Sequence, residues 1–273
     1  MLPSPVDATT AKRKLVDTYD NPSYEDPWDA VEDYEHVQRY TAAHPQQGSQ
    51  AVSTATDLPR GRIRSWVDSD GMPDCYRGLQ TALTNGWILD SWSDETARPM
   101  AMLAAWTLAS GSINEHWTPT WVTDGDDEAD ALRHHADRAN VVIEQAREAE
   151  DDRPAEWRPA ESASVLGRVL YTWLGHRGDK NHAVPFPAFL ESAPDQIRLD
   201  FARVHTQQRG IIRDDRPDRF VQIMAERSEG FRRALKELLQ SVVGNPDDIR
   251  GDSWPLRIYG DAIDTLRQYP ELD

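Results

Sequence analysis

With 273 residues, the chain is long enough for one large domain or two smaller ones. Its single cysteine, Cys75, excludes an intrachain disulfide and a zinc site of the multi-cysteine kind. No apolar run approaches the roughly 20 residues that span a bilayer, and the N-terminus lacks the apolar core of a signal peptide. We therefore expect a cytoplasmic protein with no membrane partner.

The charge of the chain needs its own explanation. Asp and Glu number 47 against 30 Lys and Arg, which gives a formal net charge of −17, and only 4 of the 30 basic residues are lysines. In dilute salt such acidity would repel nucleic acid, but molar salt screens charges beyond about 3 Å. The pattern is typical of proteins from salt-loving archaea. We expect a halophilic, haloarchaeal type of protein whose acidity reflects its solvent rather than its partner.

The sequence of the N-terminal third predicts a disordered arm followed by a small helical module. Residues 1–27 are rich in Pro, Asp, Ser and Thr with little periodicity, which is typical of a disordered arm. Four helices are then expected from the apolar spacing, over residues 30–43, from Ser49 onward, over 61–67 and over 74–86. Ser49 is the expected N-cap of the second helix, whose inward residues would be Ala51, Val52 and Ala55. Together these helices predict a module over residues 28–90.

Three arginines lie close together after the turn at Leu58–Pro59. If Ile63, Trp66 and Val67 face inward, the arginines and Ser65 fall on the outward arc. The planar fork of arginine suits guanine edges and phosphates, so this spacing indicates a helix-turn-helix that reads the DNA major groove. The preceding helix would donate to phosphates. The candidate DNA-binding residues are Ser49, Gln50, Thr54, Arg60, Arg62, Arg64 and Ser65.

Residues 95–270 predict an α/β (α+β) repeat in two halves, about 95–175 and 185–270. A helix over 98–110 ends at Gly111, and a helix over 193–209 ends at Gly210. Each is followed by two strands, a helix, two strands and a helix. A unit that occurs twice commonly packs against its copy about a pseudo-twofold axis.

The two helix ends carry a resemblance to a known family. LAAWTLASGSI at 103–113 and FARVHTQQRGII at 201–212 resemble the signature helices of LAGLIDADG homing endonucleases, with Gly111 and Gly210 as the motif glycines. Residues 166–190 between them resemble the linker of that family. The resemblance implies two αββαββα halves whose antiparallel sheets form a saddle over DNA, with the signature helices packed at the interface.

The chain departs from that family at the positions that carry its chemistry. The resemblance places metal-binding carboxylates just before each signature glycine, where this chain has Ser110 and Arg209. Glu115, Asp214 and Asp215 lie downstream and are expected to be solvated. The adjacent His134 and His135 point in different directions on a helix and are expected at the surface. We therefore expect no nuclease activity, no metal and no cofactor.

The sequence favours a DNA-binding protein over two alternatives. The expected function is sequence-specific binding of double-stranded DNA in transcription regulation, on a catalytically inactive LAGLIDADG-like scaffold. The alternatives are an active LAGLIDADG-type endonuclease and a protein-interaction module without DNA contact, whose arginines only solvate one helix face. Oligomeric state stays open, with a homodimer as one option.

Overall fold

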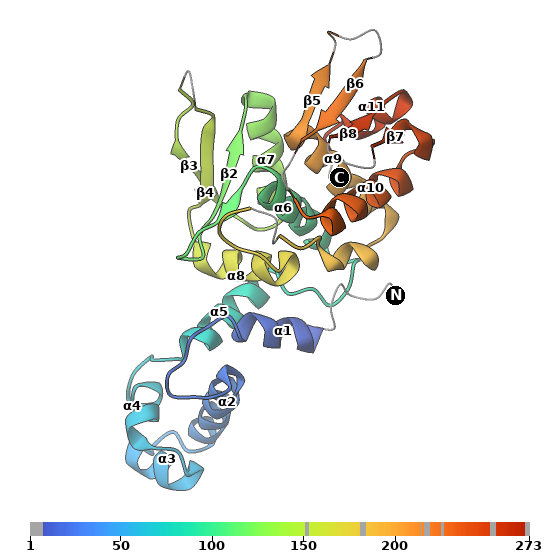
Figure 1. Ribbon diagram of the computed structural model, residues 1–273. Coiled ribbons are helices and arrows are strands. Elements are labelled where there is room, and N and C mark those ends of the chain that lie inside the picture. Colours follow the sequence, from blue (N-terminus) through green and yellow to red (C-terminus); the bar gives the residue numbers. More distant parts are fainter. Residues whose placement is uncertain are drawn as a thin grey trace. The chain divides into compact units, whose positions relative to one another are not determined.

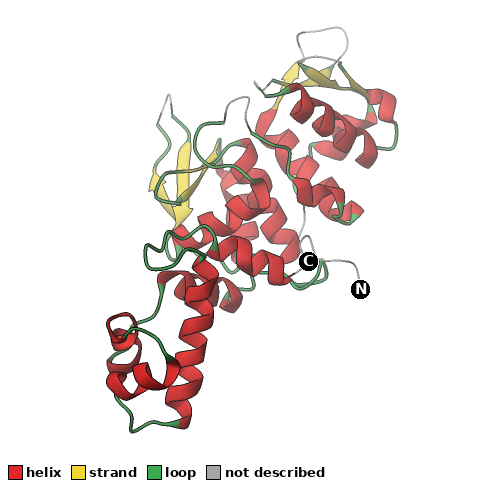
Figure 2. Ribbon diagram, turned by 60° about the horizontal axis from the view of Figure 1, so that its bottom comes forward, coloured by secondary structure: helices red, strands yellow, loops and turns green. Residues whose placement is uncertain are grey.

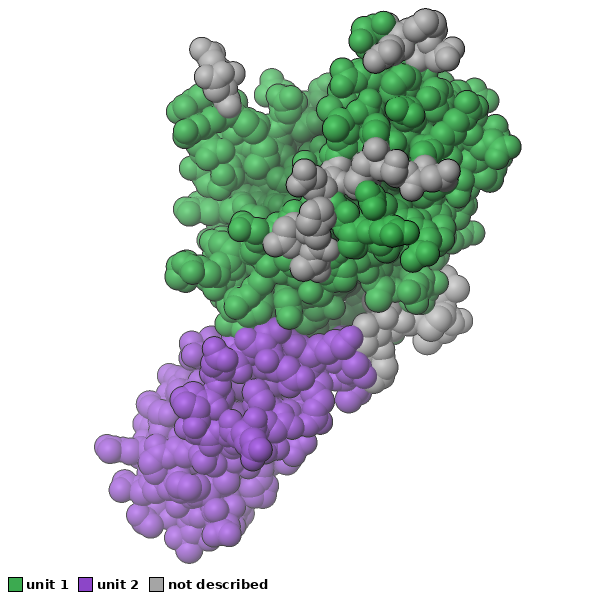
Figure 3. Space-filling model, in the orientation of Figure 1, with its two compact units in different colours: residues 1–8, 85–273 green, residues 9–84 purple. Residues whose placement is uncertain are grey.

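A computed structural model describes residues 8–150, 153–180, 184–213, 215, 219–224, 227–251 and 255–270. The chain forms two compact units, shown in Figure 3. One is helical and comprises Thr9–Thr84. The other contains Asn85–Asp273 and holds all the strands.

The helical unit consists of five helices, which are α1 (Ala8–Val16), α2 (Pro27–Ala43), α3 (Ser49–Thr56), α4 (Arg60–Asp68) and α5 (Asp74–Thr84). Helix α2 begins where the Asp26 carboxylate accepts a hydrogen bond from the Trp28 amide at 2.9 Å, with Pro27 in the first turn. The expectation of a disordered arm over residues 1–27 is wrong for residues 8–16, which form α1. Most residues of α1 are polar or small, but Leu15 and Val16 at its end are fully buried.

The centre of the helical unit is a small apolar cluster. Val37 of α2, Val52 of α3 and Ile63 of α4 are fully buried, and the partly buried side chains around them are Tyr40, Leu58, Trp66 and Val67. On α3 only Val52 carries the apolar packing, because Ala51 and Ala55 are exposed, contrary to expectation. Each short helix is thus held by one or two apolar contacts rather than by its own propensity.

The second unit repeats one order of elements. Its first half comprises α6 (Ala97–Ala109), β1 (Ser112–Ile113), β2 (Pro119–Thr123), α7 (Asp126–Arg138), β3 (Ile143–Arg147), β4 (Ala155–Pro159) and α8 (Ala163–Leu174). After the short helix η1 (Ala188–Glu191), its second half comprises α9 (Asp195–Arg209), β5 (Gly210–Arg213), β6 (Phe220–Ile223), α10 (Glu229–Val242), η2 (Pro246–Asp248), β7 (Ile249–Arg250), β8 (Leu256–Ile258) and α11 (Asp261–Leu266).

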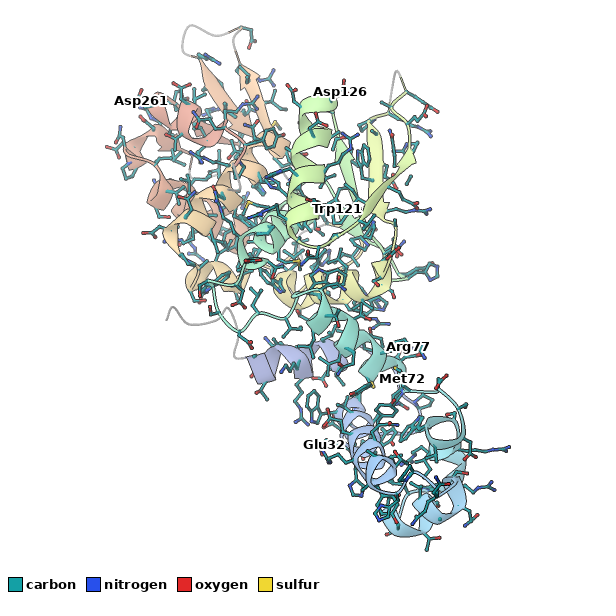
Figure 4. The ribbon with its side chains drawn as sticks, turned by 180° about the vertical axis from the view of Figure 1, so that it is seen from behind. Glu32, Met72, Arg77, Trp121, Asp126 and Asp261 are labelled. Carbon is teal, nitrogen blue, oxygen red and sulfur yellow. The ribbon has the colours of Figure 1, made fainter. Side chains whose placement is uncertain are left out.

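Each half forms one four-stranded antiparallel sheet, visible in Figures 1 and 2. The strand orders are β1-β2-β4-β3 and β5-β6-β8-β7, so the two sheets have the same topology. The mixture of helices with antiparallel sheets confirms the α+β class. Acidic residues begin helices in both halves, with Asp126 in the first turn of α7 and Asp261 in the first turn of α11 (Figure 4).

Helices α6 and α9 pack against each other at the centre of the unit. Helix α6 is buried along nearly its whole length, and its alanines let the partner helix approach closely. At one end of the contact the buried Asp200 of α9 pairs with Arg98 of α6 at 2.6 Å and with Arg203 at 3.6 Å. Trp121 of β2 is fully buried on the helix-covered face of its sheet (Figure 4). Its ring nitrogen donates a hydrogen bond to the Thr107 hydroxyl of α6 at 2.9 Å.

Candidate nucleic-acid interface

Helices α3 and α4 are joined by a turn of three residues. Asp57 ends α3 in the left-handed conformation, with φ 58° and ψ 26°. Leu58 and Pro59 complete the turn, and α4 begins at Arg60. Aspartate tolerates the left-handed conformation better than most residues. The turn therefore sets α4 against α3 through the shared Val52 and Ile63 core.

Arg62 does not face outward, so the expectation of three outward arginines is wrong at this position. Its side chain is 29% exposed and lies 3.6 Å from the Asp33 carboxylate. It donates to the Ser23 carbonyl at 3.1 Å and sits 4.3 Å from the centroid of the Tyr24 ring. Arg62 thus holds the segment before α2 against α4.

Ser49 is also used inside the unit. Gly48, not Ser49, is the N-cap of α3, and Ser49 is buried as the first helical residue. Its amide and its hydroxyl donate to the Asp68 carboxylate at 3.1 and 2.7 Å. These bonds hold the pKa of Asp68 below its usual value. The Ser49 hydroxyl also accepts from Arg60 at 3.1 Å, so it is occupied on both sides.

The remaining predicted residues lie at the surface. Gln50 and Thr54 are exposed on α3, and the Thr54 hydroxyl donates to the Gln50 carbonyl at 3.1 Å. On α4 the exposed residues recur at helical spacing, and we call four of them the α4 face: Arg60, Gly61, Arg64 and Ser65. The Arg64 side chain is 70% exposed and approaches Asp68 only to 3.9 Å. No described atom lies within 4 Å of the Cβ position of Gly61, so this face is open.

The outer surface of the second sheet is a further candidate. The family resemblance implies sheets that form a saddle over DNA, but no residue of this sheet is among the candidate DNA-binding residues predicted from the sequence. Ile211 of β5 lies opposite Gln222 of β6. The same row continues through Arg257 of β8 to Arg250 of β7. In the next row Arg213 lies opposite Phe220, whose ring is 5.5 Å from that of Tyr259. We call this surface the β5–β8 outer face: Ile211, Arg213, Phe220, Gln222, Arg250, Arg257 and Tyr259.

The β5–β8 outer face has three arginines and no carboxylate among its seven side chains. The Arg250 guanidinium lies 4.6 Å from the Tyr259 ring centroid, and that of Arg257 lies 5.8 Å from the Phe220 centroid. Stacking on rings holds an arginine in place, and Arg250 is held further by donating from Nε to the Asp247 carbonyl at 3.0 Å. Ile211 is 49% exposed in the same surface. The face is therefore basic and partly apolar within a chain of net charge −17.

The corresponding surface of the first sheet is different. There Arg147 pairs with Glu156 at 3.1 Å, and Arg158 pairs with Glu144 at 2.7 Å. These four side chains neutralise one another across strands β3 and β4. The two sheets therefore have the same topology, but their outer surfaces differ in charge.

The sequence contains a pattern that could have indicated the β5–β8 outer face. Alternation of inward and outward residues along 211–213, 220–222 and 257–259 places Arg, Gln and aromatic residues on one side of each strand. The order of the strands, which brings these sides into one surface, is set by pairing between residues far apart in the chain. That order is not readable from local alternation.

The two signature positions lie at the ends of the central helices. Ser110 caps α6, and Arg209 is the last residue of α9. A Cβ added at Gly111 would lie 2.3 Å from the Thr120 carbonyl oxygen, and one at Gly210 would lie 2.5 Å from the Thr206 carbonyl oxygen. Both glycines are therefore required where the chain turns from helix into sheet.

The acidic residues that follow the ends of α6 and α9 do not form a cluster among the described residues. Glu115 and Asp215 are both exposed, and Glu115 lies 3.4 Å from His116. Asp214 lies outside the described residues. Within the part of the chain that the structure describes, no three His, Cys, Asp or Glu side chains are grouped as a metal ion would require.

His135 is buried, contrary to the expected surface position. It is 1% exposed, and neither ring nitrogen has a hydrogen-bond partner among the described residues. Burial, followed by the nearby charges of His134 and Arg98, lowers the pKa of His135 to about 3. The reason is the spacing of the apolar stripe of α7, which is Ala129, Leu132, His135 and Ala136.

A scan against protein-family models finds no match to this chain, and a search of curated proteins finds none either. The resemblance to LAGLIDADG homing endonucleases therefore stays an expectation from the sequence motifs. Among the helices of the described residues, none has the length and apolar character to cross a membrane.

Proposed function

We propose that this chain is a sequence-specific DNA-binding protein that regulates transcription. In this proposal α3 and α4 act as a helix-turn-helix, and residues 95–270 act as a LAGLIDADG-like scaffold without nuclease activity. The working environment is a cytoplasm of high salt concentration.

The β5–β8 outer face is the observation that carries the proposal. Arginine forks bind phosphates and guanine edges, Gln222 offers both a donor and an acceptor to base edges, and Ile211 supplies apolar contact. Strands are known to enter DNA grooves in several classes of DNA reader. In molar salt the counterion-release contribution is small. Directional and apolar contacts of this kind are therefore the ones that can supply affinity.

The α4 face supports the same function from the helical unit. Two short helices joined by a three-residue turn are the arrangement of helix-turn-helix readers. Arg60 and Arg64 are exposed one turn apart on α4, and Gly61 leaves room between them for close approach. Gln50 on α3 is an exposed donor suited to phosphates. The exposed Thr54 hydroxyl donates to the Gln50 carbonyl and would have to turn from it to reach a phosphate. Ser49 is left out of the proposed contact set because it is buried, and Arg62 because it is half-buried and paired with Asp33. Arg60 stays in the set because it is exposed, although its Nε donates to Ser49.

The proposed lack of nuclease activity rests on the two helix ends. A hydroxyl at Ser110 and a guanidinium at Arg209 cannot hold divalent metal ions as two carboxylates do. Burial lowers the pKa of Arg209, yet arginine stays protonated at any ordinary pH. A permanent positive charge at that position repels a metal ion.

Selection from a random library of duplex DNA tests the function directly. The full chain would be incubated with the library at roughly 0.5 to 3 M KCl, where non-specific phosphate attraction is weak, and bound DNA would be sequenced over several rounds. We expect enrichment of one preferred sequence. Recovery of no sequence above the starting library would contradict the proposal and favour a protein-interaction module.

A further inference from the structure

Two aromatic side chains lie next to each other on the outside of the second sheet. Val221 of β6 pairs with Ile258 of β8. One position further along these strands, Phe220 therefore lies opposite Tyr259, and their ring centroids are 5.5 Å apart. Both rings are partly exposed, whereas Val221 and Ile258 are fully buried on the inward side. We call this pair the aromatic platform: Phe220 and Tyr259.

The first sheet places its aromatic residues on the opposite side. Trp121 of β2 pairs with Trp157 of β4, and both are buried. These two strands hold the same central places in their sheet as β6 and β8 do in theirs. Their outward side chains are aliphatic or polar: Thr120, Val122, Glu156 and Arg158. Outward rings are therefore not required by the repeated topology and are a property of the second sheet.

Further apolar side chains extend the platform across β5 and β6. Ile211 is 49% exposed, and Met224, which follows the inward Ile223 and so lies on the outward side, is 53% exposed. The other two exposed large apolar side chains among the described residues, Leu83 and Val142, lie outside this sheet. Burial of apolar area gains free energy, so apolar side chains gathered at one surface indicate that a partner covers it.

Arginines surround the aromatic platform. Arg213 of β5 lies opposite Phe220. The Arg257 guanidinium is 5.8 Å from the Phe220 centroid, and that of Arg250 is 4.6 Å from the Tyr259 centroid. In a chain of net charge −17, positive charge around exposed rings complements a partner that has both negative charge and flat apolar groups.

One acidic residue lies at the edge of this surface. The Tyr259 amide donates to the Asp248 carbonyl at 2.9 Å, so Asp248 is the next residue in the row. Its carboxylate accepts a hydrogen bond from the Asn245 side chain at 3.1 Å. The three arginines therefore outnumber this carboxylate, which already has a hydrogen-bond partner.

We propose that the aromatic platform binds the unpaired bases of a single-stranded nucleic acid. A base stacks on an aromatic ring through its flat face, which a single strand exposes and a duplex covers. The arginines around the platform then contact the phosphates of the strand or the outer side of a stacked base. A four-stranded sheet with exposed rings and basic side chains is one of the arrangements that serve this purpose.

This inference goes beyond the proposed function, although it uses part of the same face. In a duplex the groove edges of the bases are read by arginine and Gln222, and the ring faces have no base to stack on. The single strand can be DNA or RNA, because both expose the same base faces. Binding of a single strand is measured without a duplex, so the two proposals can fail independently.

Fluorescence anisotropy of the full chain with a labelled strand of about 12 nucleotides tests the inference, since this length lies within the range that single-strand binders cover. The strand has a mixed sequence without self-complementarity and is used as DNA and as RNA, at roughly 1 M KCl, where general attraction to phosphates is small. We expect saturable binding. Phe220→Leu and Tyr259→Leu should each weaken it by about fivefold or more, because leucine is apolar but has no flat ring.

Two control variants separate stacking from other effects. Tyr259→Phe keeps the ring and should bind the strand as the unaltered chain does. Tyr171→Leu removes a half-buried ring from α8 and should also leave binding unchanged. Thermal unfolding without nucleic acid checks the fold of each variant. If Phe220→Leu does not fold, the comparison of Tyr259→Phe with Tyr259→Leu still tests the platform.

Stronger binding of one strand type would identify DNA or RNA as the ligand, and either result supports the platform. The inference is overturned if the unaltered chain binds neither strand, or if Tyr259→Phe and Tyr259→Leu bind equally well. A chain that binds the single strand but no duplex would retain the platform and contradict only the proposed function.

Discussion

Arg62 and Arg64 are two residues apart on α4 and serve different purposes. The first is paired with Asp33, the Ser23 carbonyl and the Tyr24 ring, whereas the second extends into solvent. Sequence spacing alone assigns both to one outward arc. The difference arises from partners about 30 to 40 positions earlier in the chain, which no local pattern reveals.

Stability measurements distinguish the two arginines. Arg62→Ala should lower the free energy of unfolding by about 1 to 2 kcal/mol, because it removes a hydrogen bond, an ion pair and a ring contact. Arg64→Ala should change it by less than about 0.5 kcal/mol. Thermal unfolding of both variants, followed by circular dichroism in KCl, measures the difference. Equal effects would show that Arg62 is not a structural residue.

His135 predicts a specific loss of stability in acid. Its folded-state pKa of about 3 lies below the ordinary histidine value of about 6.5. The unfolded chain therefore binds more protons between these values, and stability falls as pH drops through that window. The variant His135→Leu should lose less stability than the unaltered chain between pH 6.5 and 4. An unchanged pH dependence of the unfolding midpoint would mean that His135 is protonated in the fold.

At the scale of elements, helices were easier to predict than strands. Helix α8, Ala163–Leu174, has a long apolar stripe, and Gly175 ends it in the left-handed conformation with φ 66°. The two strands that follow α6 are Ser112–Ile113 and Pro119–Thr123, which are two and five residues long. Strands this short carry few residues of pattern, and their limits are set by pairing across the sheet.

The ion pair between the two central helices belongs to the same scale. Asp200 is fully buried and faces Arg98 and Arg203, so Asp200→Asn leaves two arginines without their counter-charge. We expect a loss of about 3 kcal/mol in the free energy of unfolding.

Asp195→Asn on the same helix is the control for that change. The Asp195 side chain is 100% exposed and lies 3.5 Å from Arg198, and an exposed pair of this kind is worth less than about 1 kcal/mol. Denaturant unfolding of the two variants gives both values. A similar small effect in both would show that Asp200 does not hold α6 and α9 together.

At the scale of the whole molecule, the net charge of −17 predicts dependence on salt. Repulsion among the carboxylates destabilises the compact state and is screened as salt rises. The unfolding temperature should therefore increase continuously from about 0.1 M to about 3 M KCl. A midpoint that is flat across this range would contradict halophilic adaptation.

The two sheets of the second unit have the same strand order. From the sequence we expected glycine endings and an order of elements that recur in this part of the chain. The unequal charge of the two outer faces was not predicted, because it depends on which strands become neighbours. Glu144 and Arg158 neutralise each other across β3 and β4, while Arg250 lies opposite another arginine, Arg257, across β7 and β8.

Affinity for the DNA sequence recovered by selection is the most direct test of DNA binding by this chain. It would be measured at roughly 1 M KCl for the full chain and for the double variants Arg250→Gln/Arg257→Gln and Arg60→Gln/Arg64→Gln, with Arg233→Gln as the control. We predict that each double variant binds at least tenfold more weakly, at unchanged unfolding temperature, while the control binds as the unaltered chain does. Undiminished affinity in both double variants would contradict DNA binding through these two faces.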